Sequence, residues 1–242
     1  MNALNNSSSI SPGSNWRSIL LIRHGATSLN SDDHTVDRIR GWTDHPLSEE
    51  GIGEVIKIVH KIDGEPPDIL LCSDLKRAKR TAEILADLFH IPLYDCGMDF
   101  RPWDVGMYVG ANAKETVPKL ARYAIRTPLK TVPGGEGFHR FRTRFLLGLL
   151  NALQHYQGTI GIVTHHRNER LLKAWAKLGY PENGDIDPDE FTKKGETTGH
   201  CETIQIPVDR LELYAEFIKL QHMPSFGDGR EEKWREWSLE NL

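Results

Sequence analysis

The stretch Leu20-Leu-Ile-Arg-His-Gly25 is an apolar run that ends abruptly in a guanidinium and an imidazole. A short, continuous apolar run is typical of a strand buried on both faces of a parallel sheet. Open α/β proteins bind their ligands at the carboxyl ends of such strands. The stretch therefore predicts a strand over residues 18–22 that delivers Arg23 and His24 to the ligand-binding edge of a sheet.

The same corner occurs twice more along the chain. An apolar run over residues 68–72 precedes Ser73 and Arg77, and another over residues 159–164 precedes His165. Helical spacing of apolar residues separates these runs, so strands and helices alternate, which favours a mainly parallel sheet covered on both faces. We therefore expect an α/β protein, a three-layer α/β/α sandwich. The remaining expected elements are helices over 48–61, after Ser73-Asp74, over 138–153 and after 166, with strands over 91–95 and 201–207.

Composition narrows the class of protein. The 242 residues are 38% hydrophobic and 26% charged with a net charge of -4, which is typical of a globular protein and argues against a general nucleic-acid binder. No apolar run approaches the roughly 18 residues of a membrane span. Cys72, Cys96 and Cys201 have the spacing of neither a disulfide framework nor a metal site, so we expect a reducing, cytoplasmic setting without membrane or nucleic-acid partners.

The chain is expected to form one principal domain. Residues 1–16 are rich in Ser and Asn and are predicted to be a flexible tail. Residues 17–223 form the predicted domain, with an insertion at about 111–133 that is punctuated by prolines and expected to lie over the site. Residues 224–242 carry two tryptophans among charges and are predicted to be a tail or a docking helix.

The three corners would bring Arg23, His24, Arg77 and His165 together at one sheet edge. Such a cluster of cations favours an anion, and arginine forks match phosphate oxygens in bidentate geometry. The N-termini of the helices that follow the strands add positive potential there. One of the two histidines could attack phosphorus and form a phosphohistidine, while the other groups stabilise the developing charge. This chemistry requires no metal ion and no cofactor.

These residues resemble a family. Four blocks in order are similar to the histidine phosphatase superfamily, in the branch that contains cofactor-dependent phosphoglycerate mutases: Arg23-His24-Gly25-x-Thr27-x-x-Asn30, Arg38-x-x-Gly41-x-x-Asp44-x-Pro46-Leu47-x-x-x-Gly51, Ser73-x-Leu75-x-Arg77-x-x-x-Thr81-Ala82 and Val163-Thr164-His165. The resemblance implies the α/β/α sandwich, His24 as the nucleophile, and Arg23, Arg77 and His165 as the phosphate pocket. It also implies that Thr27, Asn30 and Arg38 reach the substrate.

One block departs from the family pattern, in which a glutamate donates a proton to the leaving group. Aligning Gly106 and Gly110 with the family's glycines puts Pro102 at that position, and proline cannot transfer a proton. Asp104, two residues later, and Glu136, in a Gly-Gly-Glu segment, are the alternative acids, of which we favour Asp104. A second departure is His166, at a position where a glycine often follows the histidine. His166 is either a neighbour that tunes His165 or a surface residue, and we favour the latter.

Three functions remain open. The main hypothesis is a metal-independent phosphatase that hydrolyses a small phosphate monoester through a phosphohistidine on His24. The second is a phosphoglycerate-type mutase, which returns the phosphoryl group to another hydroxyl. The third is a phosphate-binding regulatory protein with weak or no catalysis, because Pro102 replaces the usual acid glutamate. No pattern in the sequence determines the oligomeric state.

Overall fold

The computed structural model describes residues 15–30, 37–60, 62, 65–95, 97–193 and 198–222. Within these residues five strands form one sheet in the order β3-β2-β4-β1-β5. The parallel members are β1 (Trp16–Arg23), β2 (Ile69–Cys72), β3 (Leu93–Asp95) and β4 (Ile160–Thr164), and β5 (Cys201–Pro207) runs antiparallel along β1. The prediction of a mainly parallel sheet is thus confirmed, with β3 at one edge as expected.

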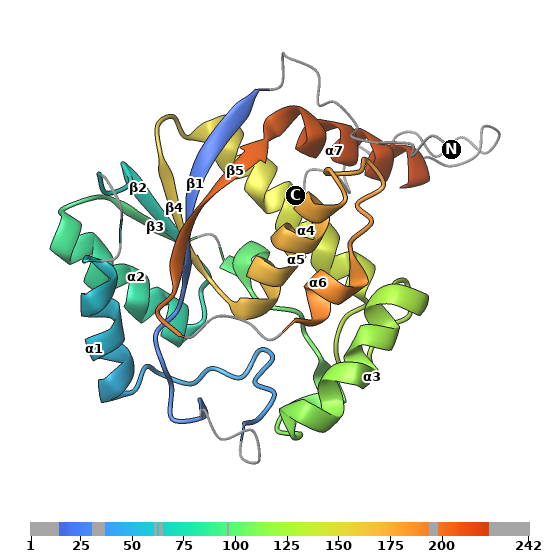
Figure 1. Cartoon of the computed structure of the whole chain (residues 1–242), viewed down its shortest axis with the longest axis horizontal. Coiled ribbons are helices and arrows are strands. Elements are labelled where there is room, and N and C mark those ends of the chain that lie inside the picture. The colour runs from blue at the N-terminus through green and yellow to red at the C-terminus, as the bar shows by residue number, and fades with distance from the viewer. Residues whose placement is uncertain are drawn as a thin grey trace, which may run out of the picture.

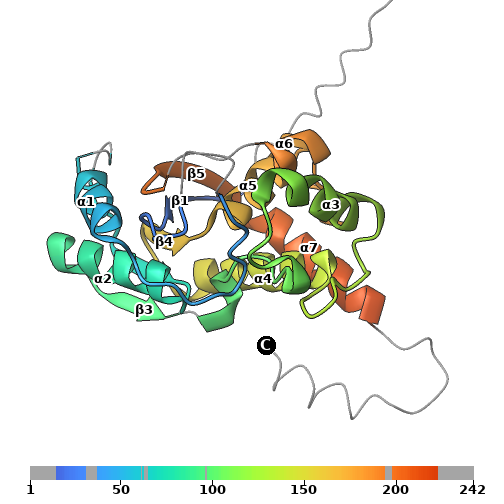
Figure 2. The same ribbon diagram turned by 90° about the horizontal axis from the view of Figure 1, so that it is seen from below.

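Helices cover both faces of this sheet, as the two views show (Figure 1, Figure 2). One face carries α1 (Glu49–Ile58) and α2 (Lys76–Phe89), and the other carries α4 (Phe138–His155), α5 (His166–Lys177) and α7 (Val208–His222). Alternate residues of β1 supply the two cores, because Ile19 and Leu21 pack on the α4 side while Leu20 and Ile22 pack on the α1 side. The three-layer α/β/α sandwich is confirmed.

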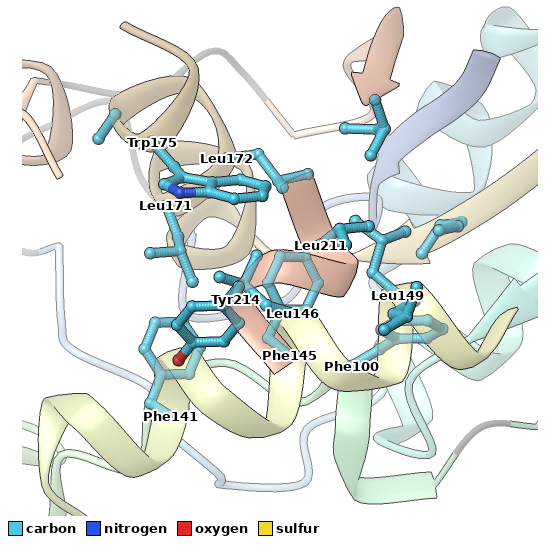
Figure 3. Packing of buried hydrophobic residues seen from close by; sticks show 14 of the residues in the cluster. Phe100, Phe141, Phe145, Leu146, Leu149, Leu171, Leu172, Trp175, Leu211 and Tyr214 are labelled. Atoms are coloured by element: carbon cyan, nitrogen blue, oxygen red, sulfur yellow. The ribbon is translucent and has the colours of Figure 1, made fainter. Parts of the chain in front are cut away.

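The larger core lies between the sheet and α4, α5 and α7. Figure 3 shows aromatic and leucine side chains from these helices packed together, with Trp175 and Tyr214 fully buried. Phe141, Phe145 and Leu149 recur along α4 at spacings of four, which is why the sequence predicted this helix well.

Three segments differ from the sequence prediction. The insertion at 111–133 contains a regular helix, α3 (Ala113–Arg126), whose Asn112 cap accepts a hydrogen bond from the Glu115 amide. The sequence after 208 has no clear helical or strand pattern and predicts mixed structure, but the segment is the helix α7. Residues 179–199 are rich in Asp, Pro and Gly and predict a loop, yet they contain the short helix α6 (Pro188–Thr192). Short 3₁₀ turns occupy Gly97–Phe100 and Gly106–Tyr108.

Ser48 and Ser73-Asp74 are of residue types that favour helix N-caps, and this prediction is confirmed for α1 but wrong for α2. Ser48 caps α1 by accepting from the Gly51 amide. In contrast, α2 begins only at Lys76, its N-cap Leu75 provides no side-chain cap, and the Lys76 amide donates instead to the Asp44 carboxylate at 2.7 Å, while Ser73 and Asp74 bond elsewhere. The predicted tail over 224–242 lies outside the described residues, and so does the predicted tail over 1–16 except at its inner end, where β1 already begins at Trp16. Among the helices described, none is long and apolar enough to cross a membrane.

Strand register brings the three sequence corners to one edge. Arg23, the last residue of β1, pairs with Thr164, the last of β4, and Cys72, the last of β2, pairs with Val163. His24, Ser73 and His165 each follow directly after these ends. The loop that follows β1 runs beside α3 at this end of the molecule (Figure 1).

Candidate active site

His24 lies directly after β1 with 4% of its surface exposed. Its Nδ1 is 2.8 Å from the Gly25 carbonyl oxygen, which can only accept, so Nδ1 carries the proton and Nε2 carries the lone pair. The turn is held because the Gly25 amide donates to the Thr81 hydroxyl on α2. Burial, and then the charges of Arg77 and Arg23, lower the pKa of His24 well below its ordinary value. His24 is therefore a neutral imidazole, the form that can attack an electrophile.

His165 faces His24 across the sheet edge. The two ring centroids are 5.1 Å apart at an interplanar angle of 62°. Nε2 of His165 is 3.0 Å from the Ser73 hydroxyl, which also accepts from the Leu75 amide. Among the described residues Nε2 is the only acceptor for the Ser73 hydroxyl proton, so the hydroxyl can donate to Nε2, which leaves the imidazole proton on Nδ1, a buried atom without a partner in the described chain. Nε2 of the neighbouring His166 is also buried without a hydrogen-bond partner among the described residues, which corrects its interpretation as a surface residue. Burial and Arg77 lower the pKa of His165 as well.

Two arginines flank the histidines. Arg77 is 1% exposed and donates to the carbonyls of Thr43 and Gly41, at 2.6 and 3.0 Å. Burial lowers the pKa of both Arg77 and Arg23 to about 10, with nearby Arg40 contributing in each case. Both guanidinium groups remain protonated near pH 7, so the structure gathers positive charge around two neutral imidazoles.

The three residues expected to reach the substrate lie in the loop after β1. Thr27 is 2% exposed, and both its amide and its hydroxyl donate to the Asn30 side-chain oxygen, at 2.9 and 2.8 Å. Arg38 forms a backbone bridge with Asn112, which ties this loop to the start of α3. Thr27 and Asn30 thus build the turn beside His24, while Arg38 lies where the loop meets α3.

The two candidate acids are joined to each other. The Asp104 amide donates to Glu136 Oε1 at 3.0 Å, and the Glu136 amide donates to the Asp104 carbonyl at 3.0 Å. The Glu136 carboxylate, 5% exposed at the residue level, also forms an ion pair with Arg144 at 2.7 Å. The half-buried Asp104 carboxylate accepts only from the Gly106 amide, at 3.1 Å, among the bonds the structure describes. Its second oxygen is therefore open to a further partner.

A known protein family matches most of the chain. Residues 19–187 match the model of the histidine phosphatase superfamily (branch 1). The chain belongs to the histidine phosphatase superfamily. The match spans both histidine corners and the arginine corner between them, as the four sequence blocks predicted.

Relatives of this chain carry both phosphatase and mutase names. The chain is 30% identical to the uncharacterized phosphatase PhoE of Bacillus subtilis, over 68% of this chain and 79% of the relative. It is 30% identical to the metal-independent phosphoserine phosphatase of Arabidopsis thaliana, over 61% of this chain and 63% of the relative. It is 27% identical to the probable phosphoglycerate mutase GpmB of Salmonella paratyphi C, over 61% and 68%. The family resemblance is confirmed, together with a phosphatase- or mutase-type activity for the class.

Solved structures agree on the fold. Mycobacterial glucosyl-3-phosphoglycerate phosphatase is 18% identical with a TM-score of 0.61, over 77% of this chain and 89% of that chain. TTHB049 from Thermus thermophilus is 25% identical with a TM-score of 0.54, over 77% and 92%.

Sequence reasoning missed Arg144, and it identified Arg40 only as a charged residue of the loop after the first strand. Arg144, on α4, donates to Glu136 and to four backbone carbonyls of the segment 98–102, at 2.7 to 3.1 Å for the carbonyls. Arg40 donates to the Leu29 carbonyl and pairs with Asp37, and its charge lowers the pKa of His24. Neither belongs to a block that marks a strand end, so only their tertiary contacts distinguish them from solvated arginines.

One cluster has the composition of a metal site. Ligand atoms of Glu169, His200 and Glu202 lie within 4.8 Å of one another. However, the Lys173 ammonium lies 2.8 Å from Glu169 and 2.6 Å from Glu202. An ammonium already neutralises both carboxylates and would repel a metal ion, so we interpret the cluster as an ion-pair network behind Arg23.

Proposed function

We propose that the protein is a metal-independent phosphatase that hydrolyses a phosphate monoester through a phosphohistidine on His24. The observation that carries the proposal is the neutral His24 imidazole, with Nδ1 tied to the Gly25 carbonyl and Nε2 left as the nucleophilic atom. The charges of Arg23 and Arg77 beside it support phosphate binding, because guanidinium forks match phosphate oxygens.

The proposed reaction has two steps. First, His24 Nε2 attacks phosphorus in line, the bond from phosphorus to the ester oxygen breaks, and an acid protonates the departing alkoxide. Arg23, Arg77 and the Nδ1 proton of His165 stabilise the charge on the equatorial oxygens. Second, water attacks the phosphohistidine, returns Nε2 to its neutral form and releases inorganic phosphate, with the same acid residue accepting the proton from water.

The hydrogen bonds support Asp104 as the acid. The Glu136 carboxylate is engaged by Arg144 in an ion pair and by the Asp104 amide in a hydrogen bond. Asp104 has one carboxylate oxygen with no bond among the described residues, and it lies in the block that carries the acid in the family. In this proposal Glu136 does not contact the substrate. It accepts a hydrogen bond from the Asp104 amide and so fixes the 104–106 turn that positions Asp104. Asp104→Asn is expected to slow alkyl phosphates about 10²- to 10⁴-fold and p-nitrophenyl phosphate much less, because its leaving group needs no proton. Glu136→Gln showing that split instead would reassign the acid.

The phosphohistidine is tested by rapid acid-free quenching. The enzyme, mixed with an excess of ³²P-labelled ester, is expected to retain about one base-stable, acid-labile phosphoryl group per chain, whereas His24→Ala retains none. Full turnover by His24→Ala would refute the proposal. His155→Ala, at an exposed histidine on the last residue of α4, is the matched control and is expected to be labelled like the wild type.

The GpmB relatives make a phosphoglycerate mutase the second candidate. Adding 2,3-bisphosphoglycerate to a mixture of the protein and 3-phosphoglycerate separates the two. Formation of 2-phosphoglycerate faster than inorganic phosphate would favour the mutase, and we expect phosphate to dominate. A protein that binds phosphate at His24 yet hydrolyses no ester of a broad panel would instead support the regulatory alternative that Pro102 raises.

A further inference from the structure

We propose that Trp42 is a positioning residue that holds the acid Asp104 at a fixed place relative to the phosphate-binding Arg77. Trp42 lies in the loop between β1 and α1 and is none of the groups that act on the substrate in the proposed reaction. The inference deepens the proposed function, and it rests on the phosphate lying at Arg77 and on Asp104 as the acid.

The backbone around Trp42 is held by Arg77. The Arg77 guanidinium is 1% exposed, and it donates through Nη1 to the Thr43 carbonyl at 2.6 Å and through Nη2 to the Gly41 carbonyl at 3.0 Å. Nε of Arg77 is buried and has no partner among the described residues, so this donor stays available for a phosphate oxygen. One guanidinium thus fixes the chain on both sides of Trp42 and keeps a donor for the substrate.

The Trp42 indole reaches the segment that carries the acid. Its Nε1 donates to the Pro102 carbonyl at 2.7 Å, across 60 positions of the chain. Asp104 follows Pro102 by two residues, and its carboxylate accepts from the Gly106 amide at 3.1 Å. The indole bond therefore joins the start of the turn that contains the acid to the loop that Arg77 holds.

Two arginines lie against the indole ring and fix its orientation. The Cζ atom of Arg101 is 4.7 Å from the ring centre, and that of Arg144 is 5.5 Å from it. Both distances are within the range of a cation–π attraction. Arg101 is itself held by two hydrogen bonds to the Asp74 carboxylate, at 2.7 and 2.6 Å, and Arg144 donates to the same Pro102 carbonyl as the indole, at 2.8 Å. The ring therefore has little freedom to turn its N–H away from Pro102.

The other side chains that bond to the 98–102 segment come from the core of the domain. Thr164 of β4 and Asn168 of α5 donate to the Phe100 carbonyl, at 2.9 and 3.4 Å, and Arg144 donates from α4. Among the hydrogen bonds that the structure describes, the indole bond is the one that joins this segment to the loop 41–43. A misplacement of about 1 Å in a reacting group can cost a large factor in rate, so this bond is expected to matter for proton transfer.

Trp42→Phe tests the link, because phenylalanine keeps an aromatic ring beside the arginines and removes the indole N–H. The expected fall in kcat is about tenfold for glycerol 3-phosphate, the loss of one hydrogen bond, and less than about twofold for p-nitrophenyl phosphate, whose leaving group needs no proton. Adding Trp42→Phe to Asp104→Asn is expected to cause no further loss, because the acid that Trp42 positions is already removed. Equal falls for both esters, or a further tenfold loss in the double variant, would overturn the positioning role.

The matched control is Trp175→Phe, which makes the same exchange at another indole that donates to a proline carbonyl. Trp175 bonds to Pro181 at 3.0 Å and lies near the end of α5 that is away from His165. Its ratio of the two kcat values is expected to equal that of the wild type, with urea unfolding confirming that both variants are folded. A change in that ratio as large as the one in Trp42→Phe would overturn the assignment.

A measurement without turnover separates this link from the phosphatase proposal. Amide hydrogen exchange of the segment 103–106 is expected to be at least about fivefold faster in Trp42→Phe than in the wild type, and unchanged in Trp175→Phe. If the chain hydrolyses no ester but shows this difference, the phosphatase proposal falls and the structural link stands. If it hydrolyses esters normally while both the exchange and the ratio of kcat values are unaffected by Trp42→Phe, the link falls and the phosphatase proposal stands.

Discussion

Replacing Arg144 with methionine is expected to destabilise the protein strongly. The guanidinium is 13% exposed and forms an ion pair with the Glu136 carboxylate, which is 6% exposed. It also donates to the carbonyls of Met98, Asp99, Arg101 and Pro102. Methionine preserves most of the side-chain length and removes all of these bonds, so the Glu136 charge is left buried without its cation.

The expected loss follows from that burial. Removing one partner of a buried ion pair costs about 3–5 kcal/mol of unfolding free energy. In a chain of this size 1 kcal/mol corresponds to roughly 2–4 °C, so the melting temperature is expected to fall by about 6–20 °C. The Asp104 amide still donates to Glu136, which favours the lower part of this range. Because the same bonds fix the segment before Asp104, kcat for alkyl phosphates is expected to fall as well.

Urea unfolding followed by tryptophan fluorescence measures the loss, since Trp103 is 1% exposed and donates to the Glu136 carbonyl. The control is Arg80→Met, which breaks the exposed pair with Glu83 and is expected to cost less than about 0.5 kcal/mol. Adding Glu136→Gln to Arg144→Met is expected to restore at least about 1 kcal/mol, because it removes the buried charge. If Arg144→Met costs no more than Arg80→Met, the structural reasoning is wrong.

Three further predictions concern the site and its support. Ser73→Ala is expected to lower kcat/KM for p-nitrophenyl phosphate about tenfold with a change of less than about 1 kcal/mol in urea unfolding, since it removes one hydrogen bond that orients a histidine ring; a normal rate would contradict this role. His24, His165 and His166 each have a pKa that is lower in the folded than in the unfolded state, so the unfolded state binds more protons below about pH 6.5. The unfolding free energy therefore falls as the pH drops below about 6.5, by at most about 1.4 kcal/mol per pH unit for each histidine. Urea unfolding from pH 7 to pH 5 measures this slope, which His166→Gln is expected to reduce by one histidine's share; an unaltered slope would be evidence against that shift. Gly106→Ala is expected to cost at least about 2 kcal/mol, because φ is +43° and the methyl group meets the 133–135 turn, whereas Gly53→Ala, in open space on α1, is expected to be neutral or stabilising; thermal melts of both variants decide it.

The sheet and the four residues at its edge were predictable because they depend on local patterns. Each apolar run ends in a polar corner, and parallel strands bring such corners together whatever lies between them. Amphipathic spacing likewise predicted α1, α2 and α4. In α7 the apolar residues lack a strong period, because Leu211 and Tyr214 pack into the core while Leu213 and Leu220 place apolar side chains on the exposed face. The helix therefore could not be distinguished from mixed structure.

The support of the site depended on contacts between distant segments. Glu136 was a candidate acid because of its Gly-Gly-Glu segment. Its ion pair with Arg144 of α4, and the hydrogen bond from Arg144 to the Pro102 carbonyl, join that segment to the loop before Asp104, and no sequence pattern marks these contacts. Ser73 was expected to cap α2. Its hydroxyl instead lies within hydrogen-bond distance of His165, which is 92 positions away along the chain, and no sequence pattern specifies that contact. Hydrogen-bond choices of this kind are decided by tertiary geometry.

The pairing of Arg23 with Thr164 determines how the protein is expected to lose activity on heating. Because His24 and His165 directly follow two hydrogen-bonded central strands, their separation is set by the innermost ladder of the sheet and not by a surface loop. Central strands exchange their amide protons only through global opening in most proteins. The two rings therefore keep their spacing until the whole domain opens, and thermal inactivation should coincide with the loss of near-ultraviolet circular dichroism instead of preceding it.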